Sequence, residues 1–281
     1  MEPADRIAIN ETIEAALDGE SAVFVATVTG GGEPPFLELA DKLLISREGR
    51  RIGSLGRPQV DTAVEAVAQF AYTALPRIGV QTLYVAEDGA TTLRRHEAHP
   101  GAAEVMLQLW EQPARLIIVG GGHVGLALAT QGEQLGFAIT VIDDREDFAN
   151  GERFPMAEHV LCGDLAEELD AIVFDETVHV VLVSRGHVQD ERALRHSVGR
   201  SAGYVGMIGS RRRTATVLQH LRSEGYDDRA LEAVSTPIGL DIGAETPEEI
   251  ALSILAEIVM LRRGRTGLRL REQRVHVPDL P

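Results

Sequence analysis

The sequence is poor in several residue types, and each scarcity narrows the classes of protein to which it can belong. Cys162 is the only cysteine, which excludes a disulfide framework and a multi-cysteine metal or iron–sulfur site within one chain; we interpret it as a buried strand end. Lys42 is the only lysine, so Schiff-base chemistry has a single candidate, which we interpret as a surface residue. No stretch reaches the roughly 18 uninterrupted apolar residues of a membrane span, and the first residues do not resemble a signal peptide. We therefore expect a cytoplasmic protein with no membrane partner.

Positive charge is also scarce. The 27 lysines and arginines face 43 aspartates and glutamates, which gives a formal net charge of −16 at pH 7. An acidic surface repels a phosphate backbone, so we expect no nucleic-acid partner. A G-x-S-x-G elbow, an H-E-x-x-H pair and a P-loop are missing as well, and no nucleophile–base–acid series replaces them.

The most informative segment is residues 116–125, Leu-Ile-Ile-Val-Gly-Gly-Gly-His-Val-Gly. A short apolar run stops at a glycine turn and a small-residue helix follows, which is the setting of a dinucleotide fingerprint. Gly120 allows the tight turn, Gly122 lets the backbone approach a phosphate, and Gly125 lets the helix lie close to its strand. The helix N-terminus then offers free N–H groups to an anion. The pattern predicts a Rossmann-type fold.

A second apolar strand supports this interpretation. Residues 137–142 lead into Asp143, which follows Gly125 at the distance where a ribose-binding acid is expected. We predict that Asp143 meets a ribose or a polar group of a pterin. Because a fold does not fix a function, the use of NAD(P) remains one alternative.

A chain of 281 residues suggests two domains. Residues 1–93 predict a small mixed α/β domain, with helices over 5–19 and 61–72 and strands over 22–29, 42–46, 52–55 and 80–86. Residues 94–114 are predicted to be a linker that contains a helix over 102–110, because Pro100 and Pro113 mark its ends.

Residues 115–265 predict a Rossmann-type domain, followed by a tail over 266–281. Strands over 116–119, 138–142, 159–161, 179–183 and 204–208 alternate with helices near 124–135, 164–170, 190–199, 211–223 and 247–262. This alternation calls for a parallel sheet covered on both faces, so the fold class is α/β. Thr246, Pro247 and Glu249 form a capping box at the start of the last helix. Its predicted core stripe is Ile250, Ile254, Ile258 and Leu261.

Three loops follow predicted strands and should converge, because ligands bind beyond the carboxyl ends of such sheets. They are residues 120–125, residues 184–187 with Asp190, and residues 206–213. In the third loop, Ser210 opens a helix and Arg211 can clamp a phosphate; in the alternative interpretation Ser210 is only an N-cap. We predict no catalytic residue and no metal ligand, and the candidate cofactor-binding residues are Gly120, Gly122, His123, Gly125, Asp143, His187, Ser210 and Arg211.

Five segments together resemble the XdhC/CoxI family, the accessory factors of xanthine dehydrogenase and related molybdenum hydroxylases. The resemblance extends from about residue 117 to residue 262. It rests on Gly-Gly-Gly-His-Val-Gly (120–125), Val-Ile-Asp-Asp-Arg (141–145), Ser-Arg-Gly-His (184–187), Tyr-Val-Gly-Met-Ile-Gly-Ser-Arg (204–211) and Pro-Ile-Gly-Leu-Asp-Ile-Gly-Ala-Glu-Thr-Pro-Glu-Glu-Ile-Ala (237–251).

The resemblance implies a cytoplasmic chaperone that binds the molybdenum cofactor, aids its sulfuration and hands it to a client. The implied partners are a cysteine desulfurase and an apo molybdenum hydroxylase, and we expect the chain to form a homodimer. Two alternatives stay open: an NAD(P)-dependent oxidoreductase, and a non-catalytic nucleotide-binding protein. The oxidoreductase lacks a recognisable acid–base group for hydride chemistry, such as a Tyr-x-x-x-Lys pair.

The N-terminal region departs from that family. Its first loop reads Gly-Gly-Gly-Glu-Pro-Pro (30–35), and its second reads Gly-Ser-Leu-Gly-Arg-Pro-Gln-Val-Asp (53–61). In the second loop Arg57 and Pro58 replace two glycines, and Asp61 stands where the family has a glutamate. A loop without those glycines is not expected to offer the same backbone N–H groups to a ligand.

Overall fold

The computed structural model describes residues 2–73 and 79–272, apart from the side chains of Thr73 and His187. The chain divides into two compact units, an N-terminal unit (1–112 with 263–281) and a Rossmann unit (113–262). Within the described ranges, none of the helices combines the length and the apolar character that crossing a membrane would require.

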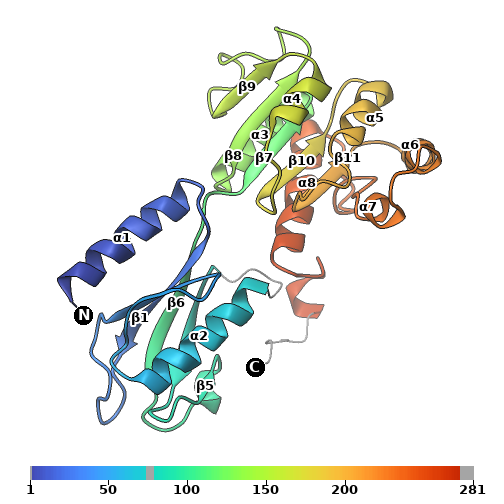
Figure 1. Cartoon of the computed structure of the whole chain (residues 1–281). Coiled ribbons are helices and arrows are strands. Elements are labelled where there is room, and N and C mark those ends of the chain that lie inside the picture. Colours follow the sequence, from blue (N-terminus) through green and yellow to red (C-terminus); the bar gives the residue numbers. More distant parts are fainter. Residues whose placement is uncertain (1, 74–78, 273–281) are drawn as a thin grey trace. The chain divides into compact units, whose positions relative to one another are not determined.

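The N-terminal unit is an antiparallel sheet between two helices (Figure 1). Helix α1 (Pro3–Leu17) packs Ile9 and Ala16 against one face, and α2 (Pro58–Thr73) packs Val64 and Ala68 against the other. The 3-10 helices are η1 (Arg95–Glu97) and η2 (Leu270–Glu272). In the sheet order β3-β2-β1-β6-β4-β5, the strands are β1 (Val23–Gly30), β2 (Lys42–Ser46), β3 (Arg51–Gly53), β4 (Val80–Val85), β5 (Thr91–Thr92) and β6 (Ala103–Trp110).

The helix predicted over 102–110 is wrong, because these residues form β6. The strand lies in the interior of the sheet and pairs with β1 on one side and β4 on the other. Ala103, Val105 and Leu107 are fully buried, while the residues between them are only partly so. The pairing with two neighbouring strands therefore outweighs the helix preference of the side chains in this segment. The segment belongs to the core of the N-terminal unit instead of a linker.

The Rossmann unit contains a five-stranded parallel sheet with the order β11-β10-β7-β8-β9. Its strands match the predicted ones to within one residue: β7 (Arg115–Val119), β8 (Ala138–Asp143), β9 (His159–Cys162), β10 (Val178–Leu182) and β11 (Tyr204–Met207). The chain adds β8 and β9 on one side of β7 and then β10 and β11 on the other side, so the strand order reverses between β7 and β10. Leu182 pairs with Val119, so β10 and β7 end side by side. Such a switch point is where open α/β sheets bind ligands.

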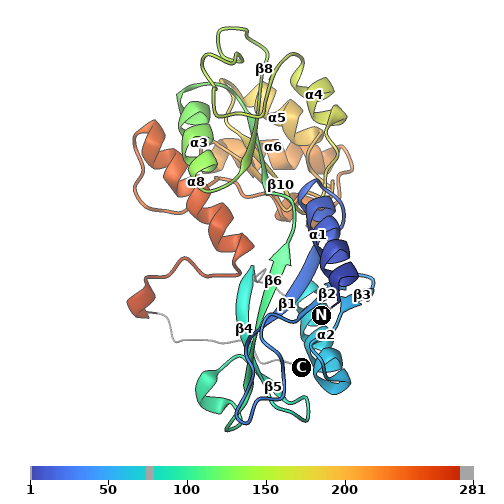
Figure 2. The same cartoon turned by 90° about the vertical axis from the view of Figure 1, so that its left-hand side faces the viewer.

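Helices cover both faces of this sheet, as predicted (Figures 1 and 2). On one face, α3 (His123–Gln134) packs beside α8 (Pro247–Arg262) over Leu116 and Ile118. The other face holds α4 (Leu165–Ala171), α5 (His187–Arg195), α6 (Arg211–Ser223) and the unpredicted α7 (Asp228–Glu232). The fold class is thus α/β with a Rossmann-type unit.

Two details of this unit differ from expectation. Cys162 is exposed, because β9 is an edge strand with a partner on one side only. Leu261 is 45% exposed and is not part of the α8 core stripe, whereas Ile254 and Ile258 are fully buried. The capping box of α8 is confirmed, since the Glu249 amide donates to Thr246 Oγ1 and the Thr246 amide donates back to the Glu249 carboxylate.

Candidate functional site

The glycine loop between β7 and α3 is shaped by close backbone contacts. Gly120 has φ of +119°, and a Cβ there would lie 2.6 Å from the carbonyl oxygen of Val183 in the neighbouring strand end. A Cβ at Gly125 would collide with the carbonyl oxygen of Gly120, and one at Gly121 with that of Phe148. Gly122 is different, because a Cβ there would meet nothing within 4 Å. The open space beside Gly122 is where the fingerprint places a phosphate.

Asp143 holds this loop in place. Its carboxylate, 3% exposed, accepts the Gly121 N–H at 2.8 Å and the Arg145 Nε–H and Nη2–H at 2.8 and 2.9 Å. Burial by itself would raise the pKa of Asp143, but the hydrogen bonds from Arg145 and Gly121 outweigh it and lower the pKa. The same interaction raises the pKa of Arg145. The acid predicted to face a ribose is therefore already engaged by the protein.

A second arginine of the loop after β8 reaches the glycine loop. Arg153 donates from Nε to the carbonyl oxygen of Gly121 at 2.9 Å, and its guanidinium lies near the Phe148 ring. Its Nη2 is buried and has no hydrogen-bond partner within the described residues. A buried guanidinium N–H without an acceptor is costly, so an acceptor supplied by a ligand would be favourable here.

Three helices begin at the carboxyl edge without a side-chain cap. The N-cap residues are Gly122 for α3, Gly186 for α5 and Ser210 for α6, and none of them makes a capping side-chain hydrogen bond. By contrast, Asp164 caps α4 and Asp227 caps α7. The free N–H groups and the helix dipoles thus make the edge at β7, β10 and β11 attractive to an anion.

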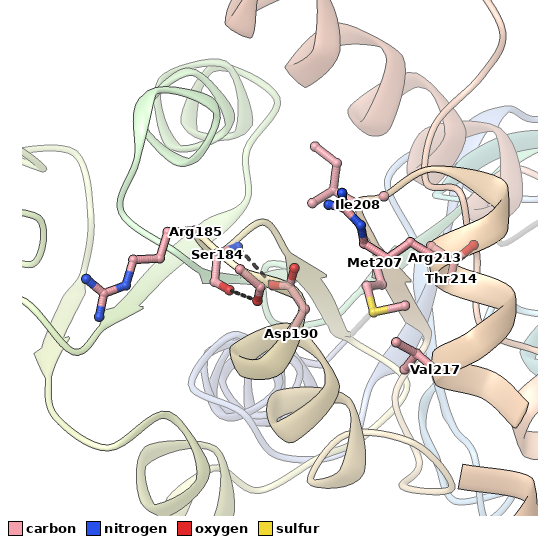
Figure 3. A pocket seen from close by; sticks show the side chains of 10 residues that line it. Ser184, Arg185, Asp190, Met207, Ile208, Arg213, Thr214 and Val217 are labelled. Atoms are coloured by element: carbon pink, nitrogen blue, oxygen red, sulfur yellow. Dashed lines mark hydrogen bonds between the residues drawn. The ribbon is translucent and has the colours of Figure 1, made fainter. Parts of the chain in front are cut away.

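The loops after β10 and β11 line one cavity of about 240 Å³ (Figure 3). Ser184 and Asp190 lie on its β10 side, where the Ser184 N–H donates to the Asp190 carboxylate at 3.0 Å. Gly209, Arg213 and other residues of the β11 loop and α6 form the opposite side. The glycine loop adjoins the β10 loop through the contact of Gly120 with Val183 and Ser184. The three predicted loops therefore lie together at this edge.

Arg185 takes a different direction. Its side chain points away from Asp190, Met207 and Arg213 (Figure 3) and pairs with Asp144 at an N···O distance of 3.2 Å. Asp144 follows β8, and β7 lies between β8 and β10 in the sheet. The ion pair thus joins the two loops that flank the glycine loop.

The predicted site residues are distributed unevenly. Gly120, Gly122 and Gly125 shape the glycine loop, and His123 is exposed at the start of α3. His187 opens α5, but its side chain lies outside the described residues. Ser210 and Arg211 are exposed at the start of α6, and Arg211 lines neither the cavity nor the groove beside it. The sequence did not predict that Gly121 and Arg153 belong to this edge or that Arg213 lines the cavity. These roles follow only from contacts in the folded structure.

In the N-terminal unit, the carboxylate of Asp61 closes the loop over residues 53–61, the loop in which Arg57 and Pro58 stand in place of glycines. Asp61 is buried and accepts hydrogen bonds from Ser54 Oγ at 2.6 Å and from the Leu55 N–H at 2.8 Å. Pro58 begins α2 directly after Arg57. This carboxylate therefore stabilises a turn at a helix start.

The chemistry that this edge supports is anion binding. The edge offers an anion backbone N–H groups, uncapped helix starts and arginine side chains. Three of these arginines form no ion pair with another described residue: Arg211, Arg212 and Arg213. Across the described ranges, no group of three or more metal-ligating side chains lies together.

The parallel sheet with its glycine loop defines a Rossmann-type protein. A sequence model of the XdhC Rossmann domain matches residues 116–258, about half of the chain. The chain belongs to the XdhC Rossmann-domain family.

Two curated relatives align with the chain at 30% identity. One is the uncharacterized protein YqeB of Escherichia coli (strain K12), over 80% of this chain and 41% of that protein. The other, from Bacillus subtilis (strain 168), is described as a probable xanthine dehydrogenase subunit; it aligns over 57% of this chain and 46% of its own length. The chain thus spans less than half the length of either relative.

A solved structure described as a xanthine dehydrogenase from Bacillus halodurans has a similar fold. It superposes with a TM-score of 0.53 at 19% identity and covers 92% of this chain and 96% of its own. At this identity the likeness supports the fold alone.

Proposed function

We propose that this protein is an accessory factor in the maturation of a molybdenum hydroxylase, and that its Rossmann unit binds the molybdenum cofactor. Membership of the XdhC family and similarity to the Bacillus subtilis protein support the accessory role. The observation that carries the binding role is the edge at β7, β10 and β11, where three helices begin without a side-chain cap and a Cβ on Gly122 would meet nothing within 4 Å.

The residues at this edge fit the anionic part of the cofactor, its pterin phosphate. The N–H groups of the first turn of α3 beside Gly122, or those of the first turn of α6 together with Arg211, would hold the phosphate. The buried Nη2 of Arg153 would gain the acceptor it lacks. When bound, the cofactor supplies the molybdenum centre of the client; this chain contributes positioning and charge. The proposed partners are a cysteine desulfurase for sulfuration and the apo-hydroxylase that receives the cofactor, with a homodimer as the working assembly.

Asp143 disfavours the oxidoreductase alternative. An NAD-specific site uses the strand-end acid to accept hydrogen bonds from the ribose hydroxyls. Here that carboxylate already accepts the Gly121 N–H and the Arg145 guanidinium, so a ribose would compete with both. The geometry of the glycine loop remains compatible with a nucleotide-binding protein without catalysis.

The test is a binding experiment on the full chain. The protein is incubated with molybdenum cofactor released from a purified molybdenum hydroxylase and passed through a desalting column. Retained pterin is measured by fluorescence after oxidation, and retained molybdenum by mass spectrometry. We expect both in stoichiometric ratio, and we expect Gly122→Val to lose them at unchanged stability, because its side chain enters the phosphate space.

Parallel titrations with NAD, NADP and the cofactor separate the alternatives. Binding of the cofactor with no binding of either nucleotide at millimolar levels supports the proposal. Nucleotide binding without cofactor retention would reject it in favour of the nucleotide-binding alternatives. Equal cofactor retention by wild type and Gly122→Val would remove the glycine loop from the site.

A further inference from the structure

A large groove runs along the outer side of the Rossmann unit between α5 and α6. Its volume is about 850 Å³, more than three times that of the cavity at the strand ends. Helix α5 contributes positions one and two turns apart, Val188, Glu191, Arg192 and Arg195; helix α6 contributes Arg213, Thr216, Val217 and His220 in the same spacing, with Ser210 and Arg212 at its start. Two turns of helix make a groove about 10 Å long.

The groove is basic in a chain that is acidic as a whole. Four arginines line it against one glutamate, while the chain carries a net charge of −16. Arg192 and Arg195 are held by ion pairs, to Asp164 at 2.7 Å and to Glu191 and Glu224 at 2.8 and 2.6 Å. Arg212 and Arg213 have no ion-pair partner among the described residues, and they lie in the uncapped first turn of α6. The end of the groove nearest the strand ends therefore carries uncompensated positive charge.

The same end of the groove also has an apolar surface. Val188 is 63% exposed on the first turn of α5, and its side chain offers the groove an apolar contact. Neither phenylalanine, tyrosine nor tryptophan lines the groove, so it lacks the row of large rings on which a single-strand nucleic-acid site stacks successive bases. Arg212 and Arg213 beside the exposed Val188 match a peptide that carries acidic side chains and an apolar one.

We propose that the α5–α6 groove is a docking site for an acidic, partly apolar helical segment of another protein. The acidic side chains of that segment pair with Arg212 and Arg213, and an apolar side chain packs on Val188. The groove begins at the carboxyl edge of the sheet, so a protein held there stands beside the candidate cofactor site. This docking role goes beyond cofactor binding and does not require it.

The probe is a fluorescent synthetic helix of about three turns with glutamates on one face and leucines beside them. Its matched control replaces each glutamate by glutamine, and a single-stranded DNA oligonucleotide of equal charge tests the competing class of ligand. Binding is measured by anisotropy at low and high ionic strength. We expect the glutamate helix alone to bind, and its affinity to fall with salt because the contacts are exposed ion pairs.

Arg212→Glu is the decisive variant, and Arg211→Glu is its control. The two arginines are neighbours in the same turn, both exposed and unpaired among the described residues, but only Arg212 lines the groove. A glutamate in the first turn of a helix suits its dipole, so both variants should fold. We expect Arg212→Glu to weaken peptide binding at least about tenfold and Arg211→Glu by less than about twofold. Val188→Asn should weaken it by about threefold.

The two proposals fail separately in this design. Gly122→Val should leave peptide affinity unchanged, so loss of cofactor binding alone leaves the groove intact. The groove proposal is overturned by any of three results: equal loss in Arg211→Glu and Arg212→Glu, equal binding of the glutamine helix, or tighter binding of the oligonucleotide than of the peptide. Absence of peptide binding at low salt also overturns it.

Discussion

Arg185 and Asp144 form an ion pair, 3.2 Å long, between the loops that follow β10 and β8. The glycine loop after β7 lies between those two loops in the order of the sheet. Both side chains are partly exposed, at 54% and 38%, and exposed pairs of this kind contribute only about 0–1 kcal/mol. An anionic ligand that approaches Gly122 therefore meets the Arg185 guanidinium, which is readily released from the ion pair, and the Asp144 carboxylate, which repels the ligand.

The first prediction concerns this anion. Asp144→Ala removes the repulsion and frees Arg185, so it should raise affinity for the molybdenum cofactor several-fold at low salt and less at high salt. Arg185→Ala should lower the affinity under the same conditions. Calorimetric titration at two ionic strengths checks both variants. A lower affinity in Asp144→Ala would mean that the carboxylate itself contacts the ligand.

The second prediction uses two adjacent glycines as a matched pair. Gly121→Ala places a Cβ against the Phe148 carbonyl oxygen and should cost about 1–3 kcal/mol or more in the free energy of unfolding. Gly122→Ala meets open space and should change the free energy of unfolding by less than about 0.5 kcal/mol. Urea unfolding of the two variants measures this. Equal stability of both would contradict the loop geometry described above.

The third prediction is a pH dependence. Asp143→Asn removes the charge that binds Arg145 and should cost about 1–3 kcal/mol in the free energy of unfolding at neutral pH. Because folding lowers the pKa of Asp143, its contribution is complete above the ordinary aspartate value of 3.8 and is lost as pH falls through the folded-state pKa. The stability difference between wild type and Asp143→Asn should therefore be constant from pH 7 to pH 5 and shrink below about pH 4. A constant difference down to pH 3 would show that the carboxylate acts in another way.

The strands of the Rossmann unit were predictable because each is a short apolar run bounded by turn residues. β6 was not, although its sequence Ala-Glu-Val-Met-Leu-Gln-Leu-Trp alternates buried and partly buried positions. Alanine, glutamate, methionine and leucine all favour helices, and the pairing with β1 and β4 that overrides them lies far away in the sequence. Cys162 illustrates the same limit, since its exposure follows from β9 having no outer neighbour.

The candidate site likewise has residues that the sequence predicts and contacts that it does not. The sequence identifies Gly120, Gly122 and Gly125, because the spacing of the three glycines by itself predicts a tight turn and close packing of the helix. The engagement of Asp143 depends on the path of the next residues, which fold Arg145 back onto its carboxylate. Arg153 reaches Gly121 from further along the same loop, and no motif announces it. Contacts made by a long loop are thus the part that spacing cannot supply.

The last prediction concerns Arg211, the arginine expected to clamp a phosphate. It opens α6 directly after Ser210, whose hydroxyl makes no capping hydrogen bond, so the helix start is free to receive an anion. Arg211→Ala should weaken cofactor binding by roughly 1.5–3 kcal/mol if the contact is charge-assisted, and Arg211→Lys should restore only part of the loss because an ammonium lacks the planar fork. The side chain is exposed and has no ion pair among the described residues, so the free energy of unfolding should change by less than about 0.5 kcal/mol. Calorimetry and urea unfolding are run on the same preparations, with Arg212→Ala as the neighbour control. If Arg212→Ala weakens cofactor binding and Arg211→Ala does not, the phosphate lies on the groove side of α6, and the pairing of Arg211 with the cofactor is wrong.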